Sequence, residues 1–385
     1  MDIHHIDTAR GNATLIVAPD GTSILVDCGA SAESFETSSP TRPNTTKRAG
    51  QWVAEYLKAN GVSTLDYCVA THVHPDHVGD VTADSPWNAD RSYRLTGISD
   101  VDAVVPIRRF VDRCAAFPRV APSEYAPPDM PFAKNWRAFL ASKQREGRVI
   151  EAPAVGLDEQ IRLGQSAAGF PAFSLRFIGA NGYVWDRDHN RVRYVFAEGR
   201  SDQDRGVRPD ENALSMAFRL EYGNFSYYSG GDLICDTRGG KYPWLDTETP
   251  VARATGKVDV AVANHHAYFD ACGEGFTRNL DAQAYVAFSW DVGHPDPAPL
   301  QRLLNGWPGE KIKDVFLTGT QPCAELVSRR FMKLVKSKQG HVVVRVDKNG
   351  DKFRIFVIDS GYATSNIISY RSDYFRVNIS ASDRI

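Results

Sequence analysis

Three histidines and an aspartate fall within six positions, directly after a short apolar run. The run, Leu65–Ala70, is bounded by turn residues and predicts a buried strand. Side chains alternate along an extended segment, so His72 and His74 point to the same side, where one cation can take both. A proline then ends the strand, and Asp76 and His77 can reach a second position nearby. This clustering favours metal binding over isolated core histidines.

The segments before this motif predict a regular order of elements. Residues 13–18 and 23–27 read as two strands joined by a tight turn at 19–22. Residues 46–60 show helical spacing of apolar side chains and end at Gly61, which is a good stop signal. The chain therefore predicts two strands, a helix, a further strand and then the metal motif.

The pattern His-x-His-x-Asp-His behind a strand resembles the signature of the metallo-β-lactamase superfamily, and the order of elements is the one that superfamily requires. The resemblance implies an α/β fold, a four-layer αββα sandwich of two mixed β-sheets flanked by helices. It also implies that Asp27, at the end of the second strand, braces the site from behind the ligands. Further ligands are expected at other strand ends.

Asp232 is the next candidate ligand along the chain. Residues 212–220 and 225–229 read as two strands joined by a turn, and the second strand runs into Gly230 and Gly231. A carboxylate that leaves a strand through two glycines is well placed to touch two cations. By the resemblance, Asp232 is the ligand that bridges them.

Two adjacent histidines follow another buried strand, which is predicted over residues 258–263. Side chains of successive residues diverge, so one of the pair is a ligand and the other a neighbour. We expect His265 to be the ligand and His266 to be a proton donor or hydrogen-bond partner, and the reverse assignment stays open. His294 precedes a helix predicted over 297–304 and is a second candidate proton donor, with a capping or packing role as the alternative.

The run of motifs, closed by a hairpin over residues 340–346 and 353–357, is similar to the hydrolase domain of ComEC-type DNA-uptake proteins. This resemblance covers nearly the whole chain. Where relatives carry His-His-Gly-Ser, this chain has Ala267 and Tyr268 after the histidines. The opening segment Ile6–Asn12 also departs from the Gly-Gln-Gly-Asp run of relatives. Both departures fall where a substrate would bind, and they leave its identity open.

The ligand count predicts two unequal metal sites. Many superfamily members place a third histidine between the motif and the bridging aspartate. Here His189 is the one histidine in that interval, in a charged stretch that predicts a solvated loop, and Asn212 stands at the equivalent point. The first site would consist of His72, His74 and Asp232. The second would consist of Asp76, His77, Asp232 and His265, and we expect it to bind its metal ion more tightly. Such donors favour one or two zinc ions, and manganese or iron(II) also fits them.

This ligand set predicts a metal-dependent hydrolase that uses a metal-bound hydroxide. Divalent ions lower the pKa of bound water from about 15.7 to near 7, and a pair about 3.5–4 Å apart suits phosphodiester cleavage. A phosphodiesterase or nuclease is favoured, with Asp76 orienting the hydroxide or accepting its proton and His266 or His294 protonating the leaving oxygen. The alternatives are hydrolysis of a lactone, β-lactam or thioester, or a non-catalytic metal-binding module of a larger assembly.

Composition sets the outer bounds of these predictions. With 385 residues, 42% of them hydrophobic, the chain can bury a large core, and we expect one domain over 1–385 with an insertion at about 84–210. The net charge of −2 shows no overall bias towards nucleic acid, although two arginine-rich segments, one of them containing Arg113, could contact a phosphate backbone. Six scattered cysteines without a Cys-x-x-Cys pair, and no apolar run long enough for a bilayer, favour a cytoplasmic protein without membrane contact.

Overall fold

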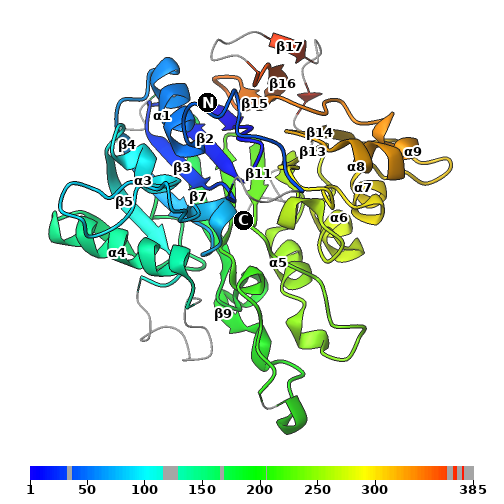
Figure 1. The fold of residues 1–385 in the computed structure, drawn as a ribbon. Coiled ribbons are helices and arrows are strands. Elements are labelled where there is room, and N and C mark those ends of the chain that lie inside the picture. Colours follow the sequence, from blue (N-terminus) through cyan, green and yellow to red (C-terminus); the bar gives the residue numbers. More distant parts are fainter. Residues whose placement is uncertain are drawn as a thin grey trace.

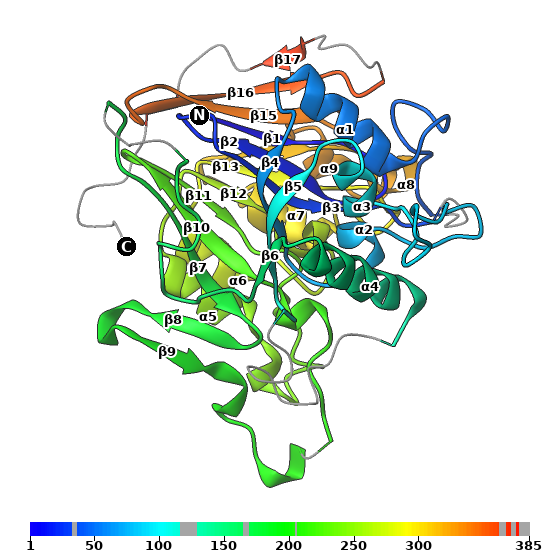
Figure 2. The ribbon, with the colours of Figure 1, turned by 90° about the vertical axis from the view of Figure 1, so that its left-hand side faces the viewer.

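Two β-sheets face each other between outer layers of helices in this computed structural model (Figure 1 and Figure 2). The structure describes residues 1–32, 37–115, 129–164, 169–204, 206–361, 367–370 and 375–376. Both sheets are mixed, with an antiparallel part followed by a parallel part. The predicted α/β class and four-layer αββα metallo-β-lactamase sandwich are confirmed.

The first sheet holds the histidine motif at the end of one of its central strands. Its order is β17-β16-β15-β1-β2-β3-β4-β5-β6, with β18 paired to β16. The pairs from β15 to β3 are antiparallel and those from β3 to β6 are parallel. The strands are β1 (Asp2–His5), β2 (Ala13–Val17), β3 (Ser23–Cys28), β4 (Leu65–Ala70), β5 (Ile107–Asp112), β6 (Val149–Glu151), β15 (His341–Val346), β16 (Lys352–Ile358), β17 (Ile367–Tyr370) and β18 (Phe375–Arg376).

The second sheet supplies the other side of the site. Its order is β14-β13-β12-β11-β10-β7-β8-β9, parallel from β11 to β14 and antiparallel elsewhere. The strands are β7 (Phe173–Ala180), β8 (Tyr183–Asp186), β9 (Arg191–Tyr194), β10 (Ala217–Tyr222), β11 (Phe225–Ser229), β12 (Val260–Val262), β13 (Ala284–Ala287) and β14 (Asp314–Leu317).

Apolar side chains form one core between the sheets and another beneath each helical layer. The central core joins side chains of both sheets, such as Val69 and Phe218. The second core lies between the first sheet and α1, α3 and α4, and the third between the second sheet and α5, α6, α7 and α9. The helices are α1 (Ala49–Ala59), α2 (Pro75–Val78), α3 (Ile98–Asp102), α4 (Pro131–Arg145), α5 (Glu248–Thr255), α6 (Glu274–Leu280), α7 (Pro297–Leu303), α8 (Pro322–Val327) and α9 (Arg329–Met332).

One predicted strand begins later than expected. The strand predicted over 212–220 is β10, and the three residues Asn212–Leu214 form a 3₁₀ turn instead. The carboxylate of Asp210 accepts a hydrogen bond from the backbone of Ala213 at 3.0 Å, which favours the turn. The backbone of Met216 then donates to the carbonyl of Thr71 at 2.9 Å, so the segment ties to the histidine motif before it joins the sheet.

The segment predicted as an insertion adds strands to both sheets. β5 and β6 extend the first sheet beyond β4, and β7, β8 and β9 extend the second beyond β10. The description of the chain as one domain with an insertion stays a prediction. Across the described residues, no helix combines the length and the apolar character needed to cross a membrane.

Candidate metal centre

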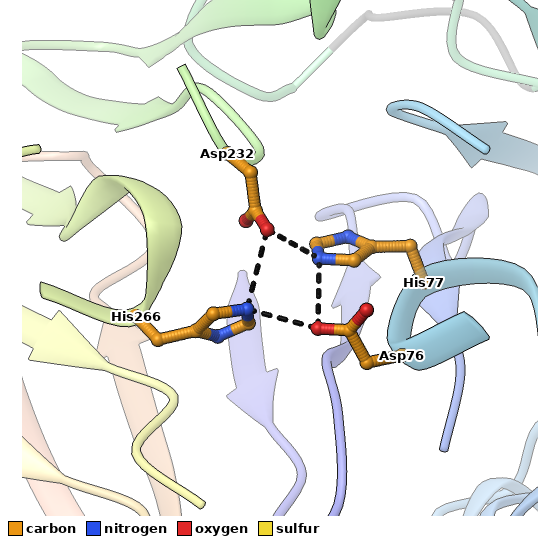
Figure 3. Close-up of side chains that lie close together, drawn as sticks. All are labelled: Asp76, His77, Asp232 and His266. Atoms are coloured by element: carbon orange, nitrogen blue, oxygen red, sulfur yellow. Dashed lines mark ion pairs between the residues drawn. The ribbon is translucent and has the colours of Figure 1, made fainter. Parts of the chain in front are cut away.

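The candidate site lies where strand ends of the two sheets meet. β4 of the first sheet runs into the histidine motif, while β11 and β12 of the second sheet lead to Asp232 and to the histidine pair. Ligands of α/β sheets commonly bind beyond the carboxyl ends of strands, because side chains from several strands converge there. Figure 3 shows four such side chains pointing towards one another from three separate segments.

Two glycines allow these segments to approach closely. Gly231 has φ of +54°, and a Cβ there would lie 2.8 Å from Thr71 Oγ1. A Cβ on Gly29, which follows β3, would lie 2.0 Å from the carbonyl carbon of Asp76. Any larger residue at either position would push the three segments apart. The glycines therefore explain how β3, β4 and β11 bring their ends together.

A group of four buried side chains forms the centre of the site: Asp76, His77, Asp232 and His266 (Figure 3). His266 Nε2 lies 2.9 Å from Asp76 Oδ2 and 3.2 Å from Asp232 Oδ2. His77 Nε2 lies 3.2 Å from Asp232 Oδ2 and 3.5 Å from Asp76 Oδ2. One ligand atom from each of the four residues lies within 4.8 Å of the others, a spacing that suits a single cation.

A second group shares Asp232 with the first. His72, His74 and Asp232 also bring one ligand atom each within 4.8 Å of one another. His72 Nε2 lies 3.1 Å from His74 Nδ1 and 3.7 Å from Asp232 Oδ2. Burial lowers the pKa of His72 well below its usual range, which favours the neutral imidazole that binds metals.

Asp27 orients His77 from behind. Its carboxylate accepts a hydrogen bond from the His77 Nδ1–H at 2.8 Å, which leaves Nε2 facing the site. The same carboxylate accepts two more bonds at 2.7 Å, from the backbone N–H and the hydroxyl of Thr71. A carboxylate that holds a ligating histidine in this way fixes both its ring orientation and its tautomer.

The two adjacent histidines lie differently from the expected assignment. His266, not His265, belongs to the group of four, and its Nδ1–H donates to the carbonyl of Phe288 at 3.0 Å. His265 Nε2 lies 4.0 Å from Asp232 Oδ2 and 3.1 Å from Asn212 Nδ2, while its Nδ1 contacts Asp270 Oδ1 at 2.6 Å. His265 is therefore a neighbour of the group of four rather than a member.

His294 lies beside the site rather than among the four side chains. Its ring stacks on that of His266, with the ring centres 4.7 Å apart and the planes inclined by 22°. Its Nδ1 accepts a hydrogen bond from the backbone of Asp291 at 3.3 Å, and its carbonyl accepts one from Ser289 at 2.5 Å. The structure thus gives His294 packing and backbone contacts.

Burial disfavours every charge in the group of four, but the opposite charges outweigh it. Desolvation acts to raise the pKa of Asp232, yet the imidazoles of His266 and His77 hold it well below its usual range. Burial acts to lower the pKa of His266, while the carboxylates of Asp232 and Asp76 raise it to about 9. The carboxylates thus hold protons on the imidazoles, and a divalent cation can replace these protons on binding.

Two buried atoms in this group make no hydrogen bond of normal geometry within the described residues, although one of them, His77 Nε2, lies within ion-pair distance of two carboxylates. They are His77 Nε2 and Asp232 Oδ1, and both side chains have almost no solvent exposure. An unpartnered buried polar atom costs about 1–3 kcal/mol. Both atoms are of the types that bind divalent cations, so the residues present fit a bound metal ion.

Sequence analysis missed a buried ion pair that supports the motif. Glu211 Oε1 accepts from the backbone N–H of Val73, between two of the histidines, at 2.7 Å. It also accepts from Arg113 Nε at 2.7 Å, and Arg113 Nη1 donates to Asn181 at 3.0 Å. The side chain of Arg113 is 0% exposed, so the prediction that it could contact a phosphate backbone is wrong. No local pattern marks Arg113 as buried, because the preceding strand β5 does not alternate between exposed and buried residues.

The N-terminal part of the sequence is similar to one protein family. Residues 6–83 match the sequence model of the metallo-beta-lactamase superfamily, a range that contains Asp27 and the whole histidine motif. The match covers about a fifth of the 385 residues. No curated protein matches the sequence.

Several solved structures resemble this chain at low identity. A diphosphatase of the PhnP family is 12% identical over 72% of this chain and 71% of that chain, with a TM-score of 0.31. Human tRNase Z, short form, is 11% identical over 90% and 100%, with a TM-score of 0.34. CmlA, a diiron β-hydroxylase from Streptomyces venezuelae, is 12% identical over 89% and 53%, with a TM-score of 0.37.

Proposed function

We propose that this chain is a metal-dependent hydrolase of phosphodiesters that holds two divalent cations, most readily zinc. One cation would be held by Asp76, His77, Asp232 and His266, and the other by His72, His74 and Asp232. The observation that supports this proposal is the meeting of two ligand groups at one buried carboxylate, Asp232. Bound divalent ions activate water near neutral pH and neutralise charge on a phosphoryl centre.

The surrounding residues would orient these ligands and contact the substrate. Asp27 and the carbonyl of Phe288 turn the Nε2 atoms of His77 and His266 towards the two carboxylates. The Nε2 atom of His266 is engaged by these carboxylates, whereas the side chain of His265 is 15% exposed and is oriented by Asp270. We therefore assign His266 to the metal ligands and place His265 where it can hydrogen-bond a bound substrate.

Two features of the sequence favour a phosphodiester. The order of motifs resembles the hydrolase domain of ComEC-type DNA-uptake proteins, and Asn212 stands where a third histidine is common. A nucleic acid is one form that such a substrate can take.

A second candidate function is hydrolysis of a small apolar substrate such as a lactone, β-lactam or thioester. It is favoured by two exposed apolar side chains close in sequence to the histidines of the site. Phe269 is 60% exposed and follows Tyr268, whose ring centre lies 5.5 Å from that of His265. Val292 is 43% exposed and lies two positions before His294.

Elemental analysis followed by substrate panels tests the proposal. The purified protein is expected to carry divalent metal and to hydrolyse bis-p-nitrophenyl phosphate or members of a nucleic-acid panel faster than lactones. Asp76→Ala should remove this activity, because Asp76 Oδ2 contacts both His77 and His266. Undiminished phosphodiesterase activity in Asp76→Ala would refute the mechanism. Activity on lactones alone would select the second candidate, and metal binding without turnover on either panel would indicate a binding module.

A further inference from the structure

The loop that follows β12 has an unusual backbone. His265, His266 and Ala267 have φ values of 43°, 55° and 58°, so three successive residues other than glycine adopt the left-handed region. Each such residue costs of the order of 1–3 kcal/mol and persists only where the surrounding structure holds it in place. The loop carries His265, His266 and Asp270, so whatever holds it also sets the geometry of the candidate site.

A single buried carboxylate ties the two ends of this loop together. Glu248, the first residue of α5, has no solvent exposure. Its Oε1 accepts hydrogen bonds from Asn264 Nδ2 at 3.0 Å and from the backbone N–H of Cys272 at 2.7 Å. Its Oε2 accepts from the backbone N–H of Gly273 at 2.8 Å. Residues 264 and 273 flank the three left-handed positions and Asp270.

Glu248 is also fixed to the segment that carries Asp232. Its backbone N–H donates to the carbonyl of Ile234 at 3.1 Å, two residues beyond Asp232. The neighbouring Cys235 donates its backbone N–H to the carbonyl of Asp270 at 2.8 Å. The start of α5 therefore connects the segment of the shared carboxylate to the loop of the histidine pair.

The three N–H donors around Glu248 favour its carboxylate form, although burial raises its pKa to about 7. Its carboxylate accepts from three N–H groups and also neighbours the thiol of Cys235, and no ion-pair partner of Glu248 is found in the described part of the chain. An ionised carboxylate accepts at both oxygens, whereas the amide of glutamine has one acceptor and would turn N–H towards N–H. A buried N–H left without an acceptor costs about 1–3 kcal/mol, which is comparable to the strain at one left-handed residue.

We propose that Glu248 is a positioning residue that holds the loop 264–273 and so places His266 opposite Asp76 and Asp232. It acts through the loop and touches neither a cation nor a substrate. The role of His266 as a ligand rests on the function proposed above, whereas the hold on the loop does not.

The test is Glu248→Gln, which keeps the size of the side chain but removes one acceptor. Hydrogen exchange of the metal-free protein should show faster exchange at Cys272 and Gly273. Titration with Co²⁺, followed by its visible spectrum and by elemental analysis, should show about 10–100-fold weaker binding, the range typical of partners behind metal ligands. The matched control is Glu274→Gln, because Glu274 on α6 is 77% exposed and should behave as the wild type.

Each outcome separates this inference from the proposed function. The inference would be overturned if hydrogen exchange in the loop 264–273 were as slow in Glu248→Gln as in the control. It would also be overturned if the wild type binds Co²⁺ and Glu248→Gln binds it with the same affinity and spectrum. Faster loop exchange in a protein whose wild type binds no Co²⁺ would support the hold on the loop and refute the proposed function. If Glu248→Gln does not fold, Asn264→Ala removes one of the three bonds and should change both readouts less and in the same direction. No change in that variant would also overturn the inference.

Discussion

The buried pair of Glu211 and Arg113 allows a quantitative prediction. In Glu211→Gln the amide oxygen can still accept from the backbone of Val73, but Arg113 loses its ion pair with Glu211. Because the Arg113 side chain has no solvent exposure, water cannot replace that partner. Removing one member of a buried pair costs about 3–5 kcal/mol. We therefore expect the free energy of unfolding to fall by about this amount, roughly a 10²–10⁴-fold change in the folding equilibrium.

Urea unfolding in the presence of a chelator measures this loss without a contribution from bound metal. The matched control is Asp2→Asn, which breaks the more exposed pair with Arg345 and should cost less than about 1 kcal/mol. Replacing both Glu211 and Arg113 by methionine should recover much of the stability, because no unpaired charge then remains. If Glu211→Gln costs as little as Asp2→Asn, the buried pair contributes no more to stability than an exposed pair.

The remaining predictions concern the histidines. His266→Ala should lose one equivalent of bound metal by elemental analysis, whereas His265→Ala should retain both; metal loss in the second variant alone would reverse the assignment. Burial disfavours the charged form of His4, His5 and His341 and lowers the pKa of each to about 4. In the unfolded chain the pKa of a histidine is near 6.5, so the unfolded chain takes up protons first as the pH falls. Stability should therefore be fully present above pH 6.5 and decrease as the pH falls towards 4, by up to roughly 3 kcal/mol per group. Urea titrations from pH 7.5 to 5 should show that the free energy of unfolding decreases less in a variant that replaces one of these histidines by glutamine. An equal decrease in the variant and the wild type would contradict this prediction.

Much of the fold could be predicted because local patterns mark strand ends. β4 and β11 have the predicted bounds, since each is a continuous apolar or aromatic run that ends at turn residues. Their ends carry the histidine motif and the two glycines before Asp232, which placed the site at the junction of the sheets. The segment Asn212–Leu214 was assigned wrongly, because the Asp210 carboxylate holds it in a turn and Met216 bonds to the histidine motif before the chain joins the sheet.

The finer geometry of the site depends on features that the sequence does not display. Which of His265 and His266 faces the carboxylates is decided by a left-handed backbone over both positions, and two identical residue types give the sequence no means of separating them. Glu211 and Glu248 resemble ordinary surface glutamates in the sequence. Their importance comes from burial and from partners far along the chain, such as Arg113, which is 98 residues away from Glu211.

The shared position of Asp232 has a mechanical consequence. Its carboxylate comes from the second sheet, whereas His72, His74 and His77 come from the first. A cation bound by these residues would therefore link the two sheets of the sandwich. Metal binding should therefore stabilise the contact between the two sheets. Chelation should weaken that contact before either sheet loses its own hydrogen bonds.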